Sequence, residues 1–77
     1  MKRLLLTQMD ENQKGVVVEI ISGHSLHNRF MSMGIYTGRE ITKLSHFALR
    51  GPVAIRVGRS VLALGHGMAN RIIVEVK

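Results

Sequence analysis

Short apolar runs separated by polar turns make up most of this chain. Residues 16–21 are apolar and β-branched apart from Glu19, which is typical of a strand. Apolar side chains occupy both alternating sets of positions in this run, so we expect a strand covered on both faces. Residues 53–57 alternate instead, with Val53, Ile55 and Val57 on one side. This pattern predicts a half-buried strand.

One segment has helical rather than strand periodicity. Leu26, Phe30 and Met33 recur at i, i+4 and i+7, which places them on one face of a helix. Ser25 precedes them, and its hydroxyl can cap the first turn. We therefore expect a short helix that begins after Ser25 and is held by packing on the sheet, because so short a helix does not persist alone.

Two glycines end this helix and the turn that follows it. Gly34 suits the left-handed position past a helix end, and Gly38 suits a turn position that a side chain would strain. A strand is predicted next, over residues 39–46. Ile41 and Leu44 break strict alternation there, so we expect a bulge or bend near Lys43.

The rest of the chain continues the β pattern. Gly58 and Arg59 predict a tight hairpin between the strand at 53–57 and the next one. The remaining elements are a loop at 47–52, a strand at 60–64, a short connection with about one helical turn at 65–70 and a last strand at 71–77.

The predicted fold is β-rich: one small barrel of about five strands, with a short helix inserted after the first main strand. A closed barrel removes the exposed edges of so small a sheet. The chain has 77 residues, and we expect a single domain over residues 1–77. A domain of this size buries only about 60% of its unfolded surface.

Composition excludes several kinds of site. The chain has no cysteine, which excludes disulfides and thiolate metal sites.

Met1–Arg3 followed by Leu4–Leu6 resembles the start of an export signal, but the apolar run is too short for one. No run approaches the roughly 20 apolar residues of a membrane span. We expect a soluble, cytoplasmic protein.

The chain is strongly basic, with a formal net charge of +6 and a pI near 10.9, which indicates an acidic partner. The basic residues do not form a run that resembles a binding arm. They stand singly, and we expect them on the outward, solvated faces of strands: Lys14, Arg29, Arg39, Lys43, Arg50, Arg56, Arg59 and Arg71.

Taken in order, these segments resemble the FeoA family of ferrous iron transport. The residues that carry the resemblance lie between Gly15 and Val76: the helix before Gly34-Ile35, Thr37-Gly38, Ile41, Gly51-Pro52, Ile55-Arg56-Val57, Ala63-Leu64, Ala69 and the strand with Ile72 and Val74. The resemblance implies an SH3-like barrel. It also implies an accessory role in ferrous iron transport through binding to FeoB, the iron permease, at the inner face of the membrane.

The chain departs from the family pattern at two points. The family commonly has an arginine after Leu64, where this chain has Gly65-His66-Gly67, and a leucine where it has Met33. The same fold forms the C-terminal module of diphtheria-toxin-repressor-type iron regulators. This sequence has no winged-helix portion, so we do not expect it to act as such a regulator by itself.

The chain does not have the residues of a catalytic, cofactor or metal site. The histidines are His24, His27, His46 and His66, and their spacing, without cysteines or a carboxylate cluster, is not that of a metal site. We interpret them as surface residues and expect His66 to be exposed. Ser25 near His24 and His27 is better explained as a helix cap than as a nucleophile. We expect no enzyme activity, no cofactor and no metal site.

The candidate partner-binding residues lie around the helix end. Methionine adapts to protein interfaces and tyrosine often anchors them. We therefore expect an apolar patch at Met31 and Tyr36, rimmed by Arg29, Arg59 and His66. The alternative for these residues is a structural one: Met33 and Ile35 in the core, partly covered by Met31 and Tyr36.

Two other functions stay open. Small basic barrels can bind nucleic acid, but the only aromatic residues are Phe30, Tyr36 and Phe47, too few for a stacking platform. This argument disfavours nucleic acid as a partner. The second of these functions is weak self-association as a structural module.

Overall fold

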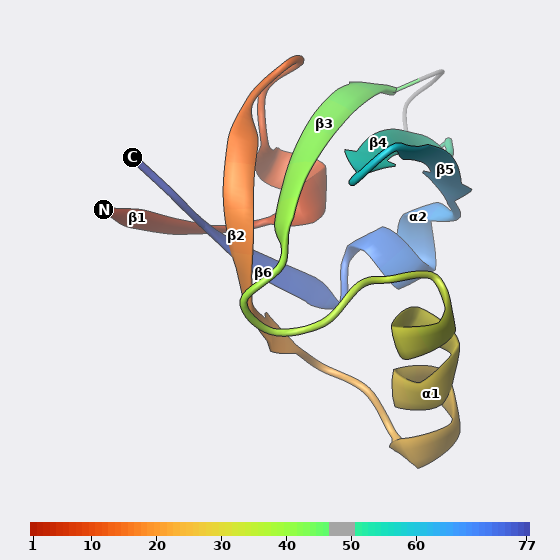
Figure 1. The fold of residues 1–77 in the computed structure, drawn as a ribbon. Helices are drawn as coiled ribbons and strands as arrows, with labels where there is room; N and C mark the ends of the chain where they lie inside the picture. Colours follow the sequence, from red (N-terminus) through yellow and green to blue (C-terminus); the bar gives the residue numbers. More distant parts are fainter. Residues whose placement is uncertain (47–50) are drawn as a thin grey trace.

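The computed structural model describes residues 1–46 and 51–77, and the described residues form one antiparallel sheet of six strands (Figure 1). The strand order is β1-β6-β2-β3-β4-β5. The strands are β1 (Lys2–Leu5), β2 (Lys14–Ile20), β3 (Glu40–His46), β4 (Val53–Val57), β5 (Ser60–Leu64) and β6 (Ile72–Val76).

The described residues also contain three short helices: the 3-10 helix η1 (Leu6–Gln8), α1 (His24–Ser32) and α2 (His66–Ala69). The β-rich fold and the helix after the first main strand are confirmed. In the part of the chain that the structure describes, no helix has both the length and the apolar character that a membrane crossing needs. The predicted loop at 47–52 lies outside the described residues from 47 to 50.

The sequence interpretation missed β1. Leu4 and Leu5 were considered as part of a possible export signal rather than as a strand, but β1 pairs with β6 through Leu4–Val74 and Leu5–Ile73. Both termini therefore lie at the same end of the sheet (Figure 1). With β1 added, the sheet has one strand more than the sequence predicted.

The core fills the inside of the curled sheet. It is built from the inward set of each strand together with residues from all three helices: Leu6, Met9, Val17, Phe30, Ile35, Ile41, Val53, Ile55, Val57, Leu64, Ala69, Ile72, Val74 and Val76. The alternation predicted for residues 53–57 is confirmed on its inward side by Val53, Ile55 and Val57. Ala54 is buried as well, whereas Arg56 is exposed.

Helix α1 packs on this core by the face that its periodicity predicted. Phe30 is fully buried, and Leu26 and Met33 pack against the core from half-buried positions. The predicted cap is wrong: α1 begins at His24, Gly23 occupies the N-cap position, and no side chain caps it. Ser25 is therefore already inside the helix, so its hydroxyl is past the position from which it could cap the first turn.

The turns around α1 agree with the sequence. Gly34 and Gly38 have φ angles of +83° and +96°, the left-handed conformation expected of them. The hairpin between β4 and β5 is also confirmed, with Gly58 at φ +59°.

Strand β2 is less covered than expected. Val17 is fully buried, but Val16 is 38% exposed and Ile21 49% exposed. A register shift between Val17 and Glu19 in the pairing with β6 breaks the alternation of the strand. Val16 and Glu19 are both exposed on β2, so the prediction that both faces are covered is wrong.

Lys43 corrects another expectation, because it is buried rather than solvated. Only 2% of the residue is exposed. Its Nζ donates hydrogen bonds to the carbonyl oxygens of Thr7, at 3.0 Å, and Met9, at 2.6 Å. The bulge expected here is present, but the register shift falls between Lys43 and Ser45. Lys43 precedes it and therefore points inward with Ile41.

These hydrogen bonds fasten the N-terminal segment to β3. The end of η1 leaves carbonyl groups without helical partners, and the Lys43 ammonium satisfies two of them. Thr7 is held from the other side, where its hydroxyl donates to Asn70 Oδ1 at 2.7 Å. Burial lowers the pKa of Lys43, and the nearby Asp10 carboxylate partly opposes that effect.

We expect Lys43→Met to destabilise the fold by about 1–3 kcal/mol at neutral pH, because the Thr7 and Met9 carbonyls lose their donor. The free energy of unfolding, measured by denaturant titration, checks this. Lys14→Met removes an exposed lysine from β2 and should change it by no more than about 0.5 kcal/mol.

The natural protein and Lys43→Met also test how the free energy of unfolding depends on pH. A lysine with a lowered folded pKa holds fewer protons when folded, so the free energy of unfolding should rise with pH between the folded and unfolded pKa values. Lys43→Met lacks this rise. The free energy of unfolding of Lys43→Met should therefore fall further below that of the natural protein as the pH approaches about 10.4. A deficit independent of pH would contradict the assignment.

Gly15 lies where β2 and β6 approach closely. A Cβ at this position would be 3.1 Å from Val76 Cγ1, 3.2 Å from Val74 Cβ and 3.3 Å from the Glu75 carbonyl oxygen. We expect Gly15→Ala to cost about 1–3 kcal/mol by overpacking. Gly67→Ala in α2 meets open space and should instead stabilise by about 0.5–1 kcal/mol. Thermal unfolding of the two variants, with opposite signs expected, checks the difference.

Candidate functional site

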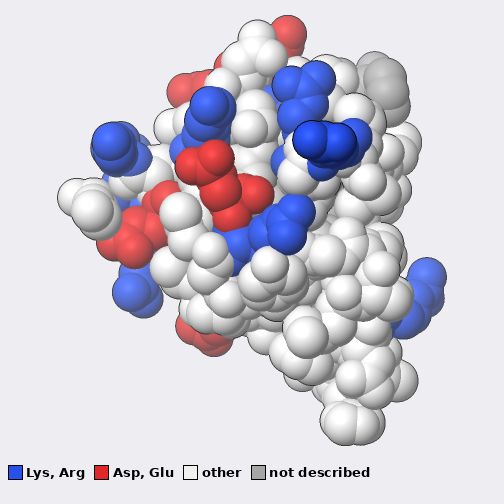
Figure 2. All heavy atoms as spheres, viewed as in Figure 1, with Lys and Arg blue, Asp and Glu red and all other residues white. Residues whose placement is uncertain are grey.

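Charge is distributed unevenly over the surface. Between Ile20 and Gly38, the only Lys, Arg, Asp or Glu is Arg29. This segment contains α1 and the turns on both sides of it. Figure 2 accordingly shows Lys, Arg, Asp and Glu gathered over the sheet, whereas the surface over α1 is almost entirely uncharged.

This segment, whose only charged side chain is Arg29, also carries exposed apolar side chains. Met31 on α1 is 50% exposed, and Tyr36 in the following turn is 37% exposed. Ile35 between them is fully buried and Met33 half-buried, as the structural alternative expected of those two residues. Met31 and Tyr36 are therefore available to a partner on the part of the chain with the least charge.

Arg39 links this segment to the β4–β5 turn, a role that the sequence interpretation missed. Its Nη1 donates a hydrogen bond to the Tyr36 hydroxyl oxygen at 3.0 Å, and its Cζ lies 5.6 Å from the centroid of the Tyr36 ring. The space in which Gly58 would carry a Cβ is occupied by the Arg39 guanidinium. The i, i+3 spacing of Tyr36 and Arg39 across the Gly38 turn was the available signal.

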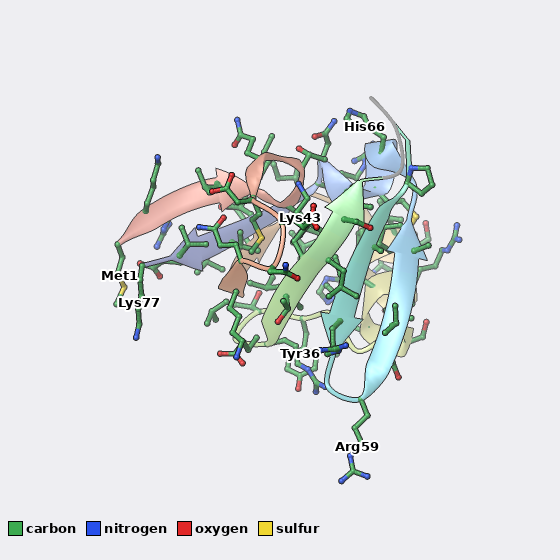
Figure 3. The ribbon with its side chains drawn as sticks, turned by 90° about the horizontal axis from the view of Figure 1, so that it is seen from above. Met1, Tyr36, Lys43, Arg59, His66 and Lys77 are labelled. Atoms are coloured by element: carbon green, nitrogen blue, oxygen red, sulfur yellow. The ribbon has the colours of Figure 1, made fainter. Side chains whose placement is uncertain are left out.

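Arg39 thus brings two of the predicted residues to one place. Tyr36 bonds to it, and Arg59 follows directly after Gly58 in the exposed turn. Tyr36 and Arg59 lie at the same end of the molecule in Figure 3. Arg29 is exposed on α1, one residue before Phe30. We call Met31, Tyr36, Arg39 and Arg59 the docking surface, in which Met31 is included because it is exposed in the same segment as Tyr36.

His66 does not join the docking surface. It begins α2 at the opposite end of the molecule from Tyr36 and Arg59 (Figure 3). It is half-buried rather than exposed as expected, and its Nδ1 is buried without a hydrogen-bond partner among the described residues. Its place in the predicted rim is therefore not supported by position.

The other histidines do not converge either. His24 and His27 are exposed on α1, and the side chain of His46 lies outside the described residues. Within residues 1–46 and 51–77, no three His, Cys, Asp or Glu side chains are grouped so that they could hold a metal ion.

The aromatic residues do not form a stacking surface in the described part of the chain. Phe30 is fully buried, and Tyr36 is engaged by Arg39. Phe47 lies outside the described residues. A single exposed ring is a poor platform for nucleobases, which require aromatic faces in succession.

Comparison with known proteins gives a consistent result. The sequence pattern of the FeoA domain family matches residues 4–76. A crystal structure described as an iron uptake regulatory protein (FeoA) is 35% identical, with a TM-score of 0.87 and 97% of each chain covered. An NMR structure of a FeoA-like protein from Clostridium acetobutylicum is 29% identical, with a TM-score of 0.84, covering 99% of this chain and 88% of that one.

More distant structures share the fold alone. A manganese-dependent transcriptional repressor is 20% identical, with a TM-score of 0.87, and the match covers 97% of this chain but 42% of the repressor. No curated protein matches the sequence significantly.

We expect Gly58→Ala to displace Arg39 from Tyr36, because the new Cβ would occupy the place of the guanidinium. The positive φ adds a cost of about 1–2 kcal/mol. Tyr36 is the only tyrosine and the chain has no tryptophan, so intrinsic fluorescence reports on this contact alone. Gly65→Ala, which meets open space, should leave the emission unchanged. Equal emission from both variants would contradict the Arg39 assignment.

Proposed function

The chain belongs to the FeoA domain family, and on that premise we propose that it serves ferrous iron transport as a small accessory protein that binds the FeoB permease. It acts in the cytoplasm on the cytosolic portion of that permease. The family and the fold support the role in ferrous iron transport. Binding to the permease is the finer step that we propose.

The observation that carries the proposal is the segment around α1, in which Arg29 is the only charged side chain. Met31 and Tyr36 are exposed there on a protein whose net charge is +6. Interface centres are depleted of charge and enriched in methionine, aromatic residues and arginine. The docking surface has this composition, with an apolar centre at Met31 and Tyr36 and cations at Arg39 and Arg59.

The mechanism that fits this surface is binding rather than chemistry. Arg39 holds the Tyr36 ring through its hydroxyl, so less rotamer freedom is lost when a partner covers it. Arg59 stands in the turn beside them, where it can pair with a carboxylate at the edge of the contact. A partner that buries Met31 and Tyr36 gains apolar area and displaces water from both side chains.

Ferrous iron uptake in the native host gives the first test. Deletion of the gene should lower uptake under iron limitation, and a plasmid copy should restore it. Unchanged uptake in the deletion strain, with the permease expressed, would contradict the role in iron transport.

The docking surface is tested by Met31→Asp combined with Tyr36→Ala. We expect this variant to fold and to bind the purified cytosolic portion of the permease at least about tenfold more weakly, because the centre of the interface is lost. Val61→Asp is the control, since Val61 is 60% exposed on β5, where it pairs with the exposed Arg56 of β4 and lies outside α1 and its following turn. Normal binding by a folded double variant would show that another face docks.

A further inference from the structure

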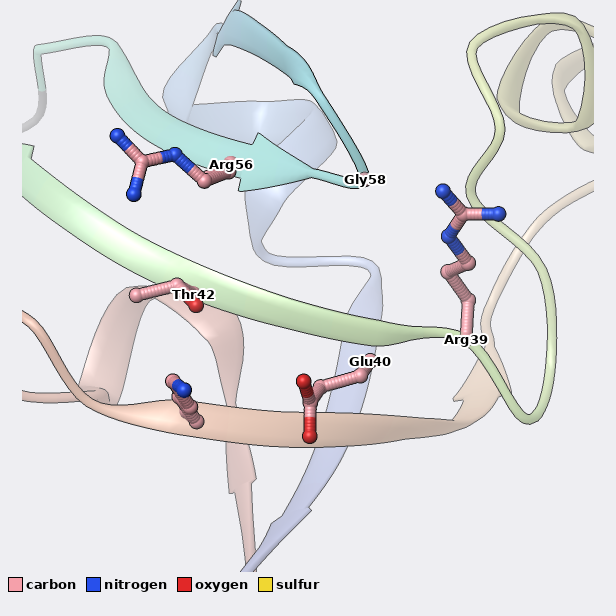
Figure 4. A pocket seen from close by; sticks show the side chains of 6 residues that line it. Arg39, Glu40, Thr42, Arg56 and Gly58 are labelled. Carbon is pink, nitrogen blue, oxygen red and sulfur yellow. The ribbon is translucent and has the colours of Figure 1, made fainter.

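A hollow of about 330 Å³ lies on the outward face of the sheet, over β2, β3 and β4. It is lined by Lys14, Arg39, Glu40, Thr42, Arg56 and Gly58. Figure 4 shows Arg39 and Arg56 on either side of Gly58, with Glu40 and Thr42 on β3, the strand between β4 and β2. We call this feature the basic hollow.

The strand register places three polar side chains side by side at the centre of the basic hollow. Lys14 on β2 is paired with Thr42 on β3, and Thr42 is paired with Arg56 on β4. Directly paired residues hold their Cβ atoms about 4.5–5.5 Å apart. Two cations therefore flank a hydroxyl in one straight row, and all three side chains can donate hydrogen bonds to the same ligand.

Cations outnumber carboxylates in this lining by three to one: Lys14, Arg39 and Arg56 against Glu40. Glu40 belongs to the neighbouring row, where it is paired with Val16, which is paired in turn with Glu75. Figure 4 shows the Glu40 side chain extending towards β2 and away from both guanidinium groups. The row of Lys14, Thr42 and Arg56 contains no carboxylate.

We propose that the basic hollow binds an acidic polypeptide segment, with carboxylate side chains seated over Lys14, Thr42 and Arg56. Carboxylates accept the charge-assisted hydrogen bonds that lysine and arginine donate. A basic residue beyond the acidic ones would meet Glu40 and Glu75. The ligand is thus a segment of mixed charge whose acidic part enters the hollow.

A nucleic acid fits this surface less well, although it also offers anions. A phosphate backbone is a continuous line of negative charge, and its course beyond the hollow meets Glu40 and Glu75 on one side and the exposed apolar Val61 on the other. None of the residues lining the hollow is aromatic. Single strands therefore find no ring on which to stack.

The inference goes beyond the proposed function and does not depend on it. The basic hollow lies on the outward face of the sheet, whereas Met31 and Tyr36 lie on α1 and its following turn. A peptide assay reports on the hollow without the permease, so failure of one proposal leaves the other standing.

The test is an amide NMR titration of the full chain at low ionic strength. The probe is a blocked peptide of four glutamates, and the matched control is a blocked peptide of four glutamines. We expect the glutamate peptide to shift the amides of Thr42, Arg56 and Gly58, and the glutamine peptide to leave them unchanged. No localised shift with the glutamate peptide would overturn the proposal.

Two double variants of equal net charge distinguish binding at this site from non-specific electrostatic attraction. Lys14→Gln with Arg56→Gln should lower the affinity for the glutamate peptide by about tenfold or more. Lys2→Gln with Lys77→Gln should bind as the natural protein does. If the first pair impairs folding, Lys14→Gln alone should still weaken binding about threefold.

Two other outcomes would overturn the proposal. Equal loss of affinity in both variants would show only non-specific attraction and would overturn the proposal. Tighter binding of a short oligothymidylate than of the glutamate peptide, at the same ionic strength, would make this a nucleic-acid surface and would overturn it as well.

Discussion

The burial of Lys43 is the constraint on which the rest of this small barrel depends. An ammonium group taken out of water must be paired or hydrogen-bonded, and here the carbonyls of Thr7 and Met9 serve that need. Those two residues enclose the end of η1, from which Leu6 and Met9 enter the core. The same contact holds η1 against β3 directly after β1, the strand that pairs with β6. A chain of this size has a small core. Anchoring the N-terminal segment therefore matters, because it keeps Leu6 and Met9 buried in that core.

Much of the fold could be predicted because local chemistry decides it. The glycines at 34, 38 and 58 have the positive φ angles that their turns require, and the periodicity around Phe30 identified the buried face of α1. Three errors have one cause, since each depends on tertiary context. A buried lysine cannot be told from a surface lysine by residue type, and β1 is a strand only because β6 lies beside it. Ser25 does not cap α1 because the N-cap position falls two residues earlier, at Gly23.

The candidate site was less predictable than the fold for the same reason. Met31 and Tyr36 could be chosen from residue type, and both are exposed. Arg39 was missed: its i, i+3 spacing to Tyr36 could have indicated their hydrogen bond, but its contact with Gly58 joins residues distant in sequence and could not be predicted. His66 shows the opposite error. It was expected to be exposed, yet it is half-buried at the start of α2, at the other end of the molecule from Tyr36, with Nδ1 buried.

Arg39 belongs to both surfaces, and this shared position limits how each can be studied. Its Nη1 bonds to Tyr36 in the docking surface, while its side chain also lines the basic hollow. A guanidinium has five N–H donors, so the bond to Tyr36 leaves others that can face a carboxylate. A substitution of Arg39 would alter both surfaces at once and could not assign an effect to either. Substitutions at Met31 and Tyr36 on one side, and at Lys14 and Arg56 on the other, leave this arginine in place and keep the two binding questions separate.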